Sequence, residues 1–152
     1  MARRIGTALA AQIARLDRQR LNEAIAAGFL PCFPETRPGV TRAFGEKDVM
    51  ALIIYARLLG LGVPPSKAGP FACQARDHID DNTEELRFTV ARGEADFFTG
   101  ERPAGAKFIG PYPIEMTITF DVGNYRTIIT KHVDEAEASR IVDIDPIVDV
   151  DE

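Results

Sequence analysis

The pattern of apolar and polar residues predicts two short helices near the beginning of the chain. Apolar side chains recur at helical intervals over residues 7–15, and Thr7 is expected to cap this helix. A second helix is expected over residues 17–27, with Asp17 as its N-cap and Gly28 as its C-terminal stop. The tight turn between the two helices is typical of a helix-turn-helix.

The next segment cannot be helical, because residues 31–44 contain three prolines and a Pro38-Gly39 turn. This composition predicts a two-stranded ribbon with a protruding tip. A long apolar stripe then predicts a helix over residues 45–60, and Pro64-Pro65-Ser66 opens another helix.

From Asp77 onward the chain becomes acidic and the pattern changes to that of strands. Strict alternation of apolar and polar residues over 114–120 has the period of two expected for a β-strand. Val122-Gly123-Asn124 is interpreted as the turn of a hairpin. The strands expected in this half cover residues 86–91, 97–99, 114–120 and 125–131.

These elements predict an α+β protein in three parts. Residues 1–80 are expected to form a winged helix-turn-helix of four helices with a β-ribbon wing. Residues 81–140 are expected to form a small antiparallel β region, and residues 141–152 a mobile acidic tail.

Charge is distributed unevenly between the two halves of the chain. The net charge is −5, but residues 1–76 carry eleven Lys/Arg against five Asp/Glu, whereas residues 77–152 carry seven against eighteen. The positive first half can attract phosphates while the acidic second half stays away from them. The overall acidity therefore does not exclude binding to nucleic acid.

A resemblance to a known family rests on the order of several short motifs. Gly28-Phe29-Leu30-Pro31 closes the second helix, Arg42-Ala43-Phe44 precedes the helix start Glu46-Lys47-Asp48-Val49, and a Leu59-Gly60 break precedes the next helix. This order resembles the DNA-binding domain of the MerR family over about residues 5–72. That family dimerises through a long C-terminal coiled-coil helix, for which the strands predicted after residue 80 leave no counterpart.

The resemblance and the charge together predict contacts with double-stranded DNA. The helix over 17–27 is expected to read the major groove, where Arg pairs with guanine and Gln or Asn pairs with adenine. The wing over 33–44 and the start of the following helix are expected to contact flanking DNA and phosphates. The candidate DNA-binding residues are Arg18, Gln19, Arg20, Asn22, Glu23, Arg37, Thr41, Arg42 and Lys47.

The sequence predicts a DNA-binding transcriptional regulator rather than an enzyme. It offers no catalytic constellation, metal site or cofactor motif, and no small-molecule ligand is evident. Cys32 and Cys73 are interpreted as structural residues that form no disulfide framework. The absence of a signal-peptide or membrane-spanning apolar run predicts a cytoplasmic protein, associated with the bacterial nucleoid when it binds DNA.

Dimerisation is expected through the C-terminal β region, whose apolar hairpin face needs a partner surface. Two other functions fit the same pattern. One is an architectural DNA-binding factor of phage type, for excision or packaging. The other is a protein-interaction module in which the acidic half mimics DNA.

Overall fold

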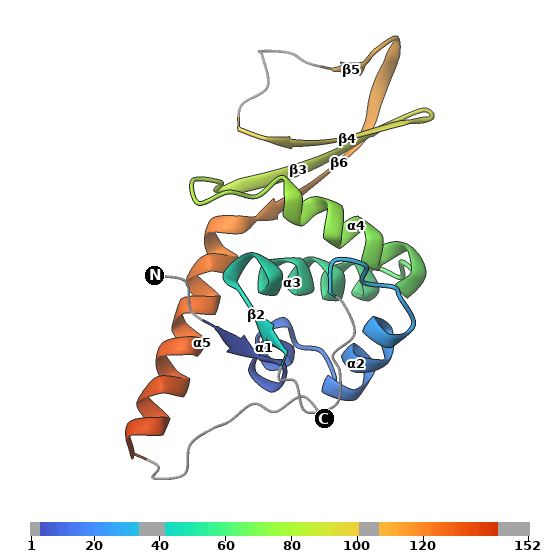
Figure 1. The fold of residues 1–152 in the computed structure, drawn as a ribbon. Coiled ribbons are helices and arrows are strands. Elements are labelled where there is room, and N and C mark those ends of the chain that lie inside the picture. Colours follow the sequence, from blue (N-terminus) through green and yellow to red (C-terminus); the bar gives the residue numbers. More distant parts are fainter. Residues whose placement is uncertain (1–3, 34–41, 101–106, 143–152) are drawn as a thin grey trace.

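The computed structural model describes residues 4–33, 42–100 and 107–142 and has the α+β class expected from the sequence (Figure 1). The described helices are α1 (Thr7–Ala14), α2 (Arg18–Ala26), α3 (Glu46–Gly60), α4 (Pro65–Asp77) and α5 (Val122–Val142). The described strands are β1 (Ile5–Gly6), β2 (Ala43–Phe44), β3 (Glu85–Ala91), β4 (Glu94–Thr99), β5 (Phe108–Ile109) and β6 (Tyr112–Asp121).

The first four helices lie where the apolar pattern predicts them, and most of their ends have identifiable causes. Asp17 caps α2, as expected, and Gly28 ends it with a φ of 77°. The expectation for Thr7 was wrong, because Gly6 occupies the N-cap position of α1 and Thr7 is the first, buried, helical residue. The side chain that was expected to cap the helix therefore packs inside the protein.

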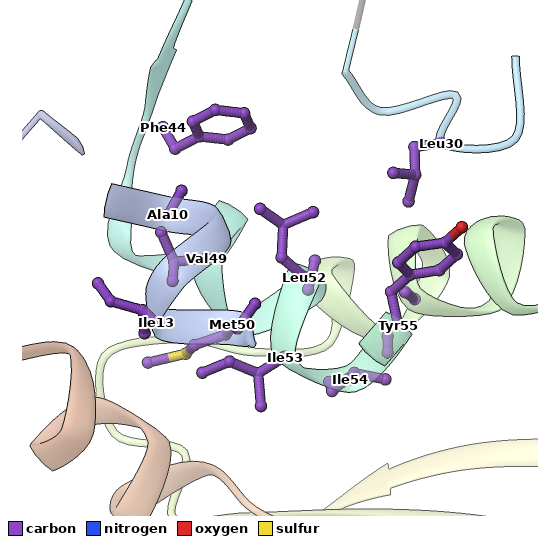
Figure 2. Packing of buried hydrophobic residues seen from close by; sticks show 14 of the residues in the cluster. Ala10, Ile13, Leu30, Phe44, Val49, Met50, Leu52, Ile53, Ile54 and Tyr55 are labelled. Carbon is purple, nitrogen blue, oxygen red and sulfur yellow. The ribbon is translucent and has the colours of Figure 1, made fainter. Parts of the chain in front are cut away.

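Helix α3 is the centre of the hydrophobic core. Eight of its residues are buried, so it is apolar around most of its circumference, as a helix covered on several sides must be. It contacts α1, α4 and α5, and Figure 2 shows its side chains between those of α1, Leu30 and Phe44. One cluster of buried residues extends from Ile5 to Val133 and so includes side chains from both halves of the chain.

Three strands of the larger sheet, β3, β4 and β6, overlap the strands predicted over residues 86–91, 97–99 and 114–120. The strand order is β4-β3-β6-β5, and all neighbours are antiparallel. Phe88 of β3 lies opposite Phe97 of β4, and both rings contact Phe71 of α4, with centroid distances of 4.5 and 5.0 Å. These aromatic contacts attach the sheet to α4.

The prediction of a strand over residues 125–131, the second arm of the hairpin, is wrong. Residues 125–131 belong to α5, which begins directly after β6 and runs to Val142, and Val122-Gly123-Asn124 forms its first turn. The side-chain oxygen of Asp121 accepts a hydrogen bond from the Asn124 N–H at 2.9 Å and so caps the helix. A 21-residue helix is therefore present after residue 80, where only strands were expected.

Arg126 attaches the beginning of α5 to the rest of the protein. Its guanidinium donates to the carbonyl oxygens of Thr83 and Asp80, both at 3.1 Å, and to Glu46 of α3 at 3.2 Å. Farther along the helix, Ile129 and Val133 are buried in the shared core. The helix thus packs on α1 and α3 of its own chain.

The predicted ribbon over residues 31–44 is only partly described, and its described part differs from the expectation. Pro31, Cys32 and Phe33 form turns and a bend rather than a strand. Ala43–Phe44 is a strand, but it pairs with Ile5–Gly6 near the beginning of the chain. The rest of the predicted wing, residues 34–41, lies outside the described residues, as does 143–152 of the predicted tail.

The two cysteines form a disulfide, contrary to the expectation from sequence. Cys32 follows α2 and Cys73 lies in α4, and the bond joins positions 41 residues apart. The bond thereby attaches the turn after α2 to α4.

Among the described residues, no helix combines the length and the apolar character needed to cross a membrane.

Candidate nucleic-acid interface

Helix α2 buries one side and presents a polar side to solvent. Leu21, Ala24 and Ile25 are buried, which fixes the rotation of the helix about its axis. At its beginning, one carboxylate oxygen of Asp17 accepts hydrogen bonds from the backbone N–H groups of Gln19, at 2.8 Å, and Arg20, at 3.3 Å. Two amides that would otherwise lack partners are thereby satisfied.

Five predicted DNA-contacting residues share this polar side. Gln19, Arg20 and Glu23 are exposed, while Arg18 and Asn22 are half-buried. Gln19 donates from Nε2 to Glu23 Oε1 at 3.2 Å, one helical turn away. The guanidinium of Arg20 makes no hydrogen bond or ion pair within the part of the chain that the structure describes. Arg20 is therefore available to an external acceptor.

Arg42 is brought to the same helix from a distant part of the chain. Its Nη1 donates to Asn22 Oδ1 at 2.7 Å in a half-buried setting. The contact occupies the amide oxygen with which Asn22 was expected to read adenine. It places Arg42, directly after the segment 34–41, against the side of α2.

The two ends of the segment 34–41 are both fixed by contacts that the sequence did not predict. At the entry, Phe33 packs edge-on against Phe44 at a centroid distance of 5.3 Å, and the Arg76 guanidinium lies 5.7 Å from the Phe33 ring centroid. Beside Phe33, the disulfide fixes Cys32. At the exit, Arg42 binds Asn22 and β2 pairs with β1.

Arg76 also organises the start of α3. Its Nη1 lies 2.6 Å from Asp48 Oδ1, and the other oxygen of Asp48 accepts from the Gly45 N–H at 2.9 Å. Arg76 therefore joins α4, the beginning of α3 and the Phe33 ring. No sequence signal marks this role, because its partners Asp48 and Phe33 lie far from Arg76 along the chain.

Lys47 lies apart from the predicted DNA-contacting residues of α2. It is exposed in the first turn of α3, which lies on the opposite side of the helical part from α2 (Figure 1). Hydrogen bonds from the Asn82 N–H and the Thr83 hydroxyl, with a smaller contribution from the charge of Lys47, lower the pKa of Asp80 below its ordinary 3.8. The positive charge of Lys47 thus interacts with the carboxylate of Asp80.

Arg37 and Thr41, the other two predicted contacts, lie outside the described residues. Among the residues that are described, no group of three or more His, Cys, Asp or Glu side chains is arranged to hold a metal ion.

The chain matches no protein-family model and no curated protein. The resemblance to the MerR family therefore stays a prediction from the sequence motifs.

Proposed function

We propose that this chain is a sequence-specific, double-stranded-DNA-binding transcriptional regulator with a winged helix-turn-helix in its N-terminal half. Helix α2 enters the major groove, and the wing predicted over residues 33–44 contacts flanking DNA. The observation that carries the proposal is the polar side of α2. The guanidinium of Arg20 on this side has no partner among the described residues, and Arg42 is hydrogen-bonded to Asn22 of the same helix.

Charge supports the same proposal. The positive residues of the first half include the exposed Arg20 and half-buried Arg18 of α2, close to the capped helix start. The acidic residues gather in the second half, which is built mainly of the larger sheet and α5. Binding through the first half is therefore electrostatically favourable despite the net charge of −5.

The test is binding of the purified chain to fragments selected from its source genome, followed by fluorescence anisotropy with R20A. Loss of one base-reading arginine is expected to weaken binding at the selected site by about 1–3 kcal/mol. R92A is the matched control, because Arg92 is an exposed arginine in the turn between β3 and β4. R20A that folds normally and binds as tightly as wild type would contradict the assignment of α2. No affinity of the wild type for DNA even at low salt would contradict the function and favour the protein-interaction alternative.

A homodimer through the C-terminal sheet forms part of the proposal. Three large apolar side chains on the paired strands β5 and β6 are unusually exposed. The exposed fractions are 58% for Phe108, 39% for Tyr112 and 50% for Met116. Dimeric regulators read two half-sites about one helical turn apart. M116K is expected to make the protein monomeric in light scattering, whereas L61K, at an exposed leucine after α3, should not. A wild type that is monomeric at all concentrations would contradict the dimer but not DNA binding.

A further inference from the structure

The turn between α1 and α2 contains an arginine in a backbone conformation that favours glycine. Arg15 has φ 60° and ψ 45°, and among the described residues it is the one non-glycine position with positive φ. Its N–H donates to the Gln12 carbonyl at 3.1 Å, and the Leu16 N–H donates to the Ala11 carbonyl at 2.8 Å. These bonds close α1 and require the left-handed conformation at Arg15.

This conformation costs stability for any residue with a Cβ, and glycine would avoid the cost. Contacts within the protein do not offset it, because the Arg15 side chain is exposed. Its guanidinium has no hydrogen bond or ion pair within the described parts of the chain. Residues held in such conformations cluster at binding and active sites.

The position of Arg15 indicates which function. It lies two residues before Asp17, the cap of α2, and three before Arg18, the first residue of that helix. The N-terminal residues of a reading helix contact the base edges in the groove, so the turn immediately before that helix lies at the sugar–phosphate rim. One oxygen of Asp17 accepts from two α2 amides, which holds this carboxylate at the helix cap.

We propose that Arg15 binds a phosphate of the DNA backbone beside the α2 groove. This inference rests on the proposed function and adds a contact that the sequence analysis did not include. A phosphate contact fixes the register of the protein on the duplex but carries no base information. Arg15 should therefore contribute equally to binding at selected and at unrelated sequences.

The experiment compares R15G, R15K and R92G with wild type in thermal unfolding and in DNA binding at several salt concentrations. R15G is expected to keep the wild-type Tm or raise it by about 2–4 °C, because the backbone strain is relieved. The same variant is expected to bind both selected and unrelated duplexes about three- to tenfold more weakly. The slope of log K against log salt should become about 0.9 smaller. R15K should keep affinity within about twofold, since lysine also binds phosphate as a point charge.

R92G removes one exposed positive charge in the second half of the chain and should leave both the affinity and the salt slope unchanged. Wild-type affinity and slope in R15G would overturn the inference. So would a loss of affinity in R15G that accompanies a lower Tm, because that result assigns Arg15 a structural role. If R20A weakens binding and R15G does not, the proposed function stands and only this inference fails. If wild type binds no DNA, both fail.

Discussion

Arg42 donates a 2.7 Å hydrogen bond from Nη1 to Oδ1 of Asn22, joining the start of β2 to the middle of α2 across 20 residues of sequence. Both residues were expected to contact DNA directly. Since they contact each other, part of their role is to hold Arg42 and the beginning of β2 against α2.

Substitution of Asn22 and Arg42, singly and together, should show that the two side chains are energetically coupled. Asn22→Ala, Arg42→Ala and the double variant, measured by urea unfolding, are expected to give a coupling free energy of about 1–2 kcal/mol, because the bond has a charged donor and is half-buried. Asn22→Ala combined with Arg92→Ala should be additive, since Arg92 lies in the turn between β3 and β4. Additivity of the Asn22 and Arg42 variants would show that the contact contributes nothing to stability.

The disulfide should contribute substantially to stability. Cys32→Ser or Cys73→Ser is expected to lower the free energy of unfolding by about 2–4 kcal/mol, because the bond closes a long loop in the unfolded chain. A reducing agent should lower wild type to the same value and leave the double serine variant unchanged. Equal stability of oxidised and reduced wild type would refute this expectation.

The state of the same bond in cells bears on the predicted cytoplasmic location. Cytosolic thiols are kept reduced, whereas disulfides persist in oxidising compartments. Thiol labelling of Cys32 and Cys73 in rapidly quenched cells therefore measures which environment the protein occupies. Full labelling without prior reduction is the result expected for a cytoplasmic protein.

Two glycines provide a matched test of the packing between α4 and the end of α2. A Cβ on Gly69 of α4 would overlap the carbonyl oxygen of Phe29, whereas a Cβ on Gly60 of α3 would meet no atom within 4 Å. Gly69→Ala is expected to cost about 1–3 kcal/mol or more, because backbone must move. Gly60→Ala should be neutral or should stabilise by about 0.4–1 kcal/mol. Chemical denaturation of the two variants measures the difference, and equal effects would mean that the α4–Phe29 approach is not close in solution.

Stability should fall at alkaline pH through a buried tyrosine. Burial raises the pKa of Tyr55 above its ordinary 10.0. Below pH 10 the phenol is protonated in both the folded and the unfolded chain. As the pH rises from about 10 towards the pKa of Tyr55 in the folded chain, the phenol of the unfolded chain loses its proton first. Deprotonation then favours the unfolded chain, so the free energy of unfolding decreases.

Tyr55→Phe should therefore reduce the slope of unfolding free energy against pH above 10, as followed by urea unfolding at each pH. Tyr112→Phe is the control, because Tyr112 lies on the exposed part of β6. An identical alkaline slope for wild type and Tyr55→Phe would contradict the assignment to Tyr55.

Much of the helical part could be predicted because its signals are local. Asp17 and Gly28 define the two ends of α2 through hydrogen bonds within a few residues, and the apolar content of residues 45–60 is sufficient to identify α3. Five of the predicted site residues share one side of α2 for the same reason. Helical periodicity alone sets which side of a helix they occupy.

The features that were missed depend on contacts between distant residues. The β-branched residues of 125–131 favour a strand locally, but Val122, Ile129 and Val133 are buried by packing against the core, which overrides that preference. The pairing of β1 with β2 involves only two residues on each strand, too few for a recognisable period. The disulfide and the contacts of Arg76 join segments whose proximity exists only in the folded chain.

The packing of α5 on α1 also has a consequence for how the protein is made. Val133 is buried in the same cluster as Ile13, so the apolar side of α1 is not fully covered until residue 133 has been synthesised. On the ribosome, the early helices must therefore wait for the second half of the chain before they reach their final packing. Until then, part of the apolar side of α1 stays exposed to water.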